Sequence, residues 1–143
     1  MIAEGFPADT YIYLDIEGGE PFGPDLAAYL SGWVPQILTA GFGLGVYCSR
    51  NIPNDVQAFV LGRYPAGVVA PPQRFWIAGD NTPSIFDRNT SVPSDATGAN
   101  ALPPKLPFSG ATAWQALSGN QTWGLTTLNV DESVSVLPDP SAP

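Results

Sequence analysis

Alternating apolar and polar positions mark a first β-strand near the start of the chain, over Thr10–Glu17. Side chains alternate between the two faces of a strand, so its aliphatic residues share one face. The other face carries two tyrosines, including Tyr13, and then the acids Asp15 and Glu17. This pattern predicts a strand buried on both sides, with one side facing a polar cavity.

Four more segments continue the chain as helix, strand, helix and strand. Apolar residues three to four positions apart predict helices over Asp25–Ala40 and Pro53–Tyr64, and Pro35 is expected to kink or divide the first of them. Apolar runs predict strands over Phe42–Ser49 and Gln73–Gly79. This alternation indicates parallel strands joined by right-handed crossovers.

The second half of the chain is less regular. Asp80–Pro107 is rich in Pro, Ser, Thr, Asn and Asp, which is typical of a lid or an inserted loop. Ala111–Ala116 is expected to form a short fourth strand and Leu117–Trp123 a turn region. Leu125–Val130 is then expected to form the last strand.

Composition and charge restrict the class of protein. The chain has 143 residues, which suits a single domain over residues 1–137 followed by a Pro-rich tail over 138–143. The net charge is −8 with only five basic residues, which disfavours nucleic acid and anionic membrane surfaces as partners. An acidic cleft instead suits a neutral or cationic ligand. No apolar run approaches the length of a membrane span.

The chain contains no histidine and one cysteine, Cys48. This composition excludes His-based triads, His-ligated metal sites and an intrachain disulfide. Any acid–base chemistry must use carboxylates, tyrosines or water, and we expect neither a cofactor nor a metal. Residues 1–10 lack the basic start and apolar stretch of a signal peptide, so the sequence leaves the compartment open.

Polar and aromatic side chains stand near the ends of the predicted strands, which meet at one mouth in a parallel barrel. Aromatics with carboxylates and without basic residues are typical of a carbohydrate cleft. Structural roles also suit some of these residues: Tyr47, Trp76 and Trp114 can be core, Asp80 a solvated loop residue, and Asp131 a cap or salt-bridge partner. The candidate site residues are Tyr13, Asp15, Glu17, Tyr47, Trp76, Asp80, Trp114, Gln115 and Asp131.

The ordered motifs of the chain resemble a known family over about Tyr11–Val134. These motifs are IYLDIEGG, ILTAGFGLGVYCS, FWIAG, ATAWQA and LNVDES. They resemble the glycoside-hydrolase-like domains of unknown function of actinobacteria and their phages, relatives of the family 25 lysozymes, which cleave peptidoglycan. The resemblance implies an α/β fold, a TIM-type (β/α) barrel. Because the family places D-x-E on a middle strand, we expect a partial barrel of about five mostly parallel strands and two main helices, with the first strands absent.

The resemblance also implies roles for individual residues. Glu17 matches the proposed general acid of the family, and Asp15 matches the acid that positions the sugar and stabilises developing positive charge. Asp131 matches a late aspartate, although Glu132-Ser133 follows it in place of the usual asparagine pattern. The cleft or wall positions of the family match Tyr47, Trp76, Trp114 and Gln115.

The expected function is therefore that of a glycoside hydrolase-like domain acting on peptidoglycan or a related cell-wall glycan. The alternative is a catalytically inactive module that binds the cell wall or forms part of a phage virion. Either reading favours a cell-wall-facing or virion-associated setting and a carbohydrate partner. An open half-barrel leaves a bare strand edge, so another chain or a second copy is expected to cover it, unless loops do so or the chain is a fragment.

Overall fold

The computed structural model describes residues 5–17, 21–78, 86–87, 92–93, 108, 110–123 and 126–143. Within these ranges only the backbone is described for residues 86–87, 92–93, 114, 116–123, 128–132 and 134. The helices and strands are β1 (Tyr11–Ile16), α1 (Pro24–Thr39), β2 (Gly43–Ser49), α2 (Pro53–Leu61), β3 (Gln73–Ala78), β4 (Phe86–Asp87), β5 (Val92–Pro93), β6 (Ala111–Trp123) and β7 (Thr126–Ser135).

The main sheet has five strands in the order β1-β2-β3-β6-β7. The first four are parallel, and β7 runs antiparallel to β6. β4 and β5 form a separate two-stranded antiparallel sheet. The α/β class and the strand–helix–strand–helix–strand order of the first half are thus confirmed. The arrangement is compatible with part of a barrel.

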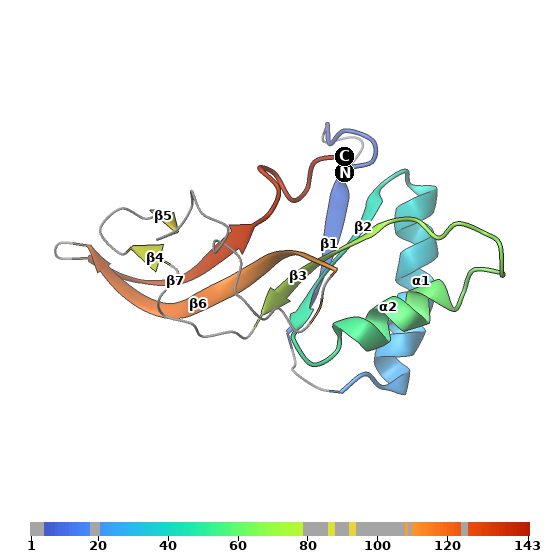
Figure 1. Ribbon diagram of the computed structural model, residues 1–143, viewed down its shortest axis with the longest axis horizontal. Helices are drawn as coiled ribbons and strands as arrows, with labels where there is room; N and C mark the ends of the chain where they lie inside the picture. Colours follow the sequence, from blue (N-terminus) through green and yellow to red (C-terminus); the bar gives the residue numbers. More distant parts are fainter. Residues whose placement is uncertain are drawn as a thin grey trace.

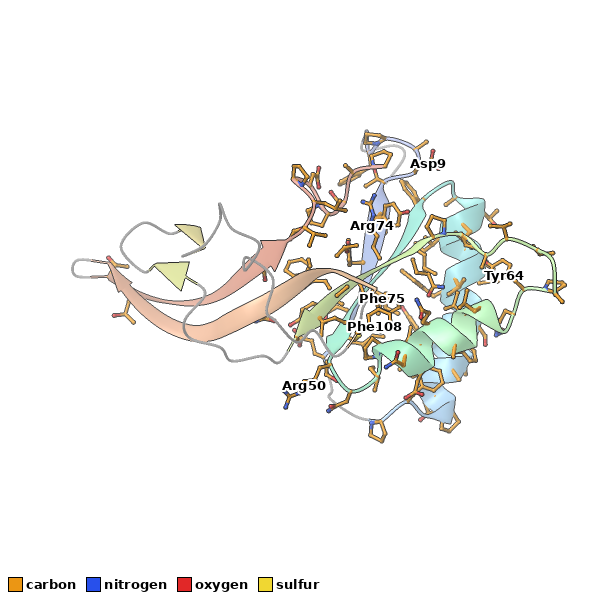
Figure 2. The ribbon with its side chains drawn as sticks, in the orientation of Figure 1. Asp9, Arg50, Tyr64, Arg74, Phe75 and Phe108 are labelled. Atoms are coloured by element: carbon orange, nitrogen blue, oxygen red, sulfur yellow. The ribbon has the colours of Figure 1, made fainter. Side chains whose placement is uncertain are left out.

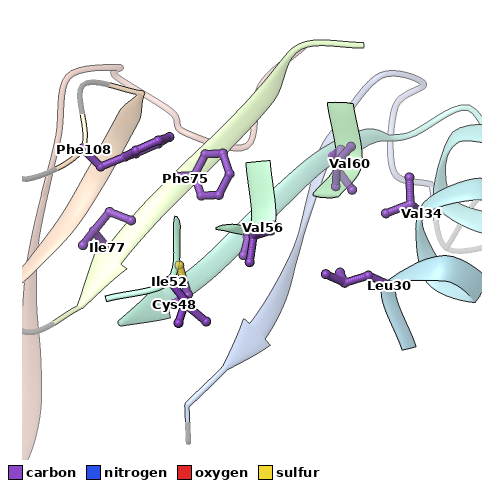
Figure 3. Packing of buried hydrophobic residues seen from close by; sticks show 11 residues of the cluster. Leu30, Val34, Cys48, Ile52, Val56, Val60, Phe75, Ile77 and Phe108 are labelled. Atoms are coloured by element: carbon purple, nitrogen blue, oxygen red, sulfur yellow. The ribbon is translucent and has the colours of Figure 1, made fainter. Parts of the chain in front are cut away.

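Both helices pack against the same face of the sheet (Figure 1). Each strand is added on the same side of the previous one, and crossovers of one hand then place all helices on one face. The core lies between the two layers (Figure 3). Its buried members are Leu30, Val34, Leu44, Val46, Cys48, Ile52, Val56, Val60, Phe75, Ile77 and Phe108. Among the described residues, no helix has the length and apolar character needed to cross a membrane.

Helix α1 continues through Pro35 as one element, so of the two expected effects of Pro35, a kink or a division, the division is wrong. The helix ends in a Schellman motif. Gly41 has a φ of +78°, which L side chains rarely adopt. Its N–H donates to Leu38 O at 3.0 Å, and the N–H of Phe42 donates to Ile37 O at 3.1 Å. These bonds satisfy carbonyls at the end of the helix and turn the chain into β2.

The hairpin of β6 and β7 differs most from expectation. Leu117–Trp123, expected as a turn region, belongs to β6 and pairs with β7. The last strand runs on to Ser135, so Asp131 lies within the strand and does not follow it. In the antiparallel pairing, Asp131 is in register with Ser118. Small and polar residues misled the prediction, because a cross-strand partner supplies the hydrogen bonds that local propensity does not anticipate. The hairpin extends well beyond the other strands, away from the helices (Figure 1).

Most side chains of β1 are half-buried or exposed, so the expectation of a strand buried on both sides is wrong, and the strand lies at an edge of the described sheet. Only Tyr11 of this strand is buried, and Asp15 and Glu17 are exposed. Among the described strands, β1 has a hydrogen-bonded neighbour only in β2. At its start, the N–H of Tyr11 donates to the carbonyl of Ser141 at 2.8 Å.

The sheet face opposite the helices carries tyrosines packed directly on glycines. A Cβ built on Gly43 would lie 2.8 Å from ring atoms of Tyr11, and one built on Gly45 would lie 2.8 Å from the ring of Tyr13. The two rings therefore cover the backbone of β2, where any side chain would displace them. The guanidinium of Arg74 stacks on Tyr11, with its central carbon 3.7 Å from the ring centroid.

The C-terminal segment, residues 138–143, returns to this face beside the start of β1 (Figure 1). The hydroxyl of Tyr13 donates to Pro140 O at 2.9 Å. Arg74 donates to Pro140 O at 2.9 Å and to the carbonyl of Ala142. Arg74 lies close to this segment in the view with side chains (Figure 2). The stretch expected as a tail thus packs on the amino-terminal half of the sheet.

Replacing Gly45 tests the packing of tyrosine on glycine. We expect Gly45→Ala to lower the free energy of unfolding by about 1–3 kcal/mol, because the new methyl group forces the Tyr13 ring to move. The control is Gly32→Ala in α1, where a Cβ meets nothing within 4 Å. That variant should gain about 0.5–1 kcal/mol from helix propensity. Urea unfolding measures both, and a neutral Gly45→Ala would contradict the packing described.

Candidate functional site

A pocket of about 400 Å³ opens on the sheet face opposite the helices. Side chains at or just after all five strands of the main sheet line it. Its volume lies within the range of small-molecule sites. The lining residues are Tyr13, Asp15, Glu17, Tyr47, Trp76, Gln115 and Ser133.

Strand register explains why these residues meet. Asp15 pairs with Tyr47, Tyr47 pairs with Trp76, and Trp76 pairs with Ala113. Residues in register on neighbouring parallel strands stand side by side on one face, about 4.8 Å apart per strand. An acid, a phenol and an indole therefore form one row across the sheet. The row ends at Ala113 on β6, which is buried.

Three aromatic rings form one wall of the pocket. The ring of Trp76 is nearly perpendicular to Tyr13, with centroids 6.1 Å apart, and to Tyr47, with centroids 5.6 Å apart. Edge-to-face pairs of this kind contribute about 0.5–1.5 kcal/mol each beyond the burial of area. Trp76 Nε1 is buried without a hydrogen-bond partner in the part of the chain that the structure describes. Trp76 is therefore fixed by its ring contacts.

An irregularity in β6 decides which residue of that strand joins the pocket. The register between β3 and β6 shifts at Thr112, whose hydroxyl donates to Phe75 O at 3.2 Å. Because of this extra residue, Gln115 is in register with Ala78 of β3. Trp114 is in register with Ile77. β-Bulges commonly re-aim side chains in this way near functional sites.

Tyr47 and Gln115 join two strands across the pocket. The hydroxyl of Tyr47 on β2 donates to Oε1 of Gln115 on β6. This bond passes over β3, which separates the two strands in the sheet. It fixes the amide plane of Gln115 at the side of the pocket that faces away from β1.

Tyr13 is held by the C-terminal segment. Its hydroxyl donates to Pro140 O, and burial raises the pKa of the Tyr13 phenol above its usual value of 10.0. Desolvation disfavours the phenolate, so Tyr13 remains a neutral donor well into alkaline pH. The phenol points to the C-terminal segment, and the ring contributes an apolar surface to the pocket.

Most of the residues predicted from the sequence come together in this pocket. Six of the candidates line it: Tyr13, Asp15, Glu17, Tyr47, Trp76 and Gln115. Asp80 lies outside the described residues. Only the backbone is described for Trp114 and Asp131, so their roles stay predictions.

Sequence reasoning missed Ser133. It pairs with Gln115 across the hairpin, so it reaches the pocket through the register of β6 and β7. The predicted turn over Leu117–Trp123 concealed that hairpin. Knowledge of the antiparallel pairing would have placed Ser133 beside Gln115.

The two acidic residues of the pocket lie at its β1 side, and the neutral polar residues Gln115 and Ser133 come from β6 and β7. Asp15 and Glu17 supply carboxylate acceptors at the β1 side, and both are exposed to solvent. None of the lining residues that the structure describes is basic. In the described part of the chain, no three His, Cys, Asp or Glu residues gather closely enough to hold a metal ion. The arrangement suits an uncharged ligand that carries hydroxyl groups and some apolar surface.

Comparison of the chain with family models, with curated proteins and with solved structures gives no match. What the pocket can do is therefore inferred from its own residues.

Tyr13 provides a test of how the C-terminal segment supports the pocket. We expect Tyr13→Phe to lower the free energy of unfolding by about 1 kcal/mol near neutral pH, because the bond to Pro140 is lost. The control, Tyr29→Phe, changes an exposed tyrosine of α1 and should have little effect.

The same pair of variants should show the pH dependence of Tyr13. Its pKa is raised in the folded state, so its contribution is complete below the unfolded value near 10.0 and is lost as pH rises through the folded pKa. Urea unfolding between pH 8 and 11 should therefore show a steeper alkaline loss of stability in the parent than in Tyr13→Phe. Equal slopes would contradict the burial of this phenol.

Proposed function

We propose that the pocket binds a carbohydrate and that the chain is a glycoside hydrolase-like domain acting on peptidoglycan or a related cell-wall glycan. One observation carries this proposal: two carboxylates and three aromatic rings share one pocket, and its described lining has no basic side chain. Aromatic faces bind the apolar surfaces of sugar rings, and carboxylates accept hydrogen bonds from sugar hydroxyls. Both features are general properties of sites for glycoside hydrolysis.

The proposed chemistry uses Asp15 near the end of β1 and Glu17, which follows this strand directly. Glu17 gives its proton to the glycosidic oxygen as the bond to the anomeric carbon breaks. Asp15 stabilises the positive charge that develops on the sugar ring. Water then adds to the anomeric carbon, and its proton returns to the Glu17 carboxylate. Asp131 is a further proposed acid of this site.

We also propose that the sheet is part of a TIM-type barrel. Three features support this: successive parallel strands lie side by side, both helices cover one face, and the polar face carries the pocket. In complete barrels the active site lies at the carboxyl ends of the strands. β1 is an edge strand, and we propose that another chain or a second copy covers that edge.

A second function is favoured by the exposure of the two acids. Asp15 and Glu17 both lie open to solvent at the edge of the sheet, whereas catalytic acids are commonly shielded so that they stay protonated. A module that binds the cell wall without cleaving it, or a structural part of a virion, would use the same aromatic wall. The first role would place the protein at a cell wall and the second in a virion.

Substitution of Glu17 separates the two functions. If the domain is an enzyme, Glu17→Gln should lower the rate of release of new reducing ends from purified peptidoglycan by about a hundredfold or more. The matched control is Asp25→Asn, which removes one exposed carboxylate from the first turn of α1. That variant should cleave at the parental rate.

Binding of the same variants to insoluble peptidoglycan completes the test. A catalytic role predicts that Glu17→Gln still sediments with the glycan while cleavage is lost. Sedimentation of the parent without any reducing ends would support the binding module. Absence of both activities in the parent would overturn the proposal of a glycan site.

A further inference from the structure

The side-chain amide of Gln115 lies in the pocket with one of its two polar ends already bonded. We propose that Gln115 determines specificity by donating from Nε2 to a neutral carbonyl oxygen of the ligand, that of an acetamido group. This inference rests on the proposed binding of a carbohydrate. It adds the chemical feature by which the pocket would distinguish an N-acetylated sugar from a sugar with hydroxyl groups alone.

The side-chain amide of Gln115 has a defined orientation. Tyr47 donates its hydroxyl to Oε1 of Gln115, so the acceptor end of the amide is engaged. An amide is planar and carries its two N–H donors on the other end. Among the described residues, none accepts a hydrogen bond from Nε2 of Gln115. Because Gln115 lines the pocket, its free donor end is available to a ligand there.

The charges around the pocket restrict which ligand group can accept a hydrogen bond from Nε2 of Gln115. A donor can bind a carboxylate, a phosphate, a hydroxyl or a carbonyl oxygen. Asp15 and Glu17 line the same pocket, its described lining contains no basic residue, and the chain has a net charge of −8. These charges repel an anionic ligand group. The acceptor that meets Gln115 is therefore neutral.

A carbonyl and a hydroxyl of the ligand differ in the partners that this pocket offers them. A hydroxyl can donate to the carboxylates on the β1 side, so it has several places to bind in this pocket. A carbonyl oxygen has no proton to give, so it gains nothing from an ionised carboxylate such as that of Asp15. Its best partner is the N–H donor of Gln115 on the opposite side. The methyl of an acetamido group can then pack against the rings of Tyr47 and Trp76.

Tyr47 acts in this scheme as a positioning residue. Its hydroxyl holds Oε1, and without that bond the amide can rotate and present either end to the ligand. The aromatic contact between Tyr47 and Trp76 keeps the phenol in place, with centroids 5.6 Å apart. Loss of the hydroxyl should therefore weaken the preference for the acetamido group without removing the aromatic surface.

The test compares two probes that differ at one position of each sugar ring. Chitotetraose carries an acetamido group at C2, and cellotetraose carries a hydroxyl there. Calorimetric titration should show that the parent binds chitotetraose about tenfold more tightly or better, as expected for one good hydrogen bond in a partly buried site. Gln115→Glu should abolish this preference, because the new side chain has no donor end.

Three further variants complete the experiment. Tyr47→Phe should reduce the preference partly, and Gln115→Met should reduce it as Gln115→Glu does without adding a charge. The control is Gln57→Glu, the same substitution on α2, on the far side of the sheet. It should retain the parental ratio of affinities. The ratio is the readout because general damage to the fold or added negative charge weakens both neutral sugars alike.

The outcomes are distinct. A lost preference in both Gln115 variants, with cellotetraose still bound, supports the role of Gln115. Equal affinity of the parent for the two sugars overturns this inference and leaves the glycan site standing. Failure of the parent to bind either sugar overturns the proposed function and this inference together.

Discussion

The handedness of the strand connections determines where this protein can have a site. Each new parallel strand is laid beside the previous one in the same direction, and right-handed crossovers then place α1 and α2 on one face. That face holds the core, with Phe75 and Leu44 fully buried in it. Neither of the two described helices lies on the opposite face, and the pocket forms there. A doubly wound sheet would have buried both faces.

An open polar face still needs support, and the tyrosines of β1 supply much of it. Tyr11 and Tyr13 lie on the bare backbone of Gly43 and Gly45, and Arg74 joins this layer to the C-terminal segment. Near the amino ends of the strands, this face is thereby covered by packed aromatic rings and backbone. The carboxyl-terminal half is left to the pocket. The division between support and site follows the direction of the strands.

The sequence allowed the prediction of much of this arrangement because its signals were local. Alternation placed Asp15 and Glu17 on one face of β1, and helical spacing identified both helices. What failed depended on partners distant in sequence: the edge position of β1, the hairpin that brings in Ser133, and the register shift at Thr112. Alternation within β6 alone cannot say which of its side chains joins the face of β1, because an extra residue in the strand reverses the answer.

The central claim is that the sheet face opposite the helices is a ligand site. The most direct measurement is a titration of ¹⁵N-labelled protein with chitotetraose, followed by backbone amide shifts. The account predicts changes that concentrate at Asp15, Tyr47, Trp76 and Gln115 and leave α1 and α2 unaffected. Changes on the helical layer, or no changes at any sugar concentration, would contradict it.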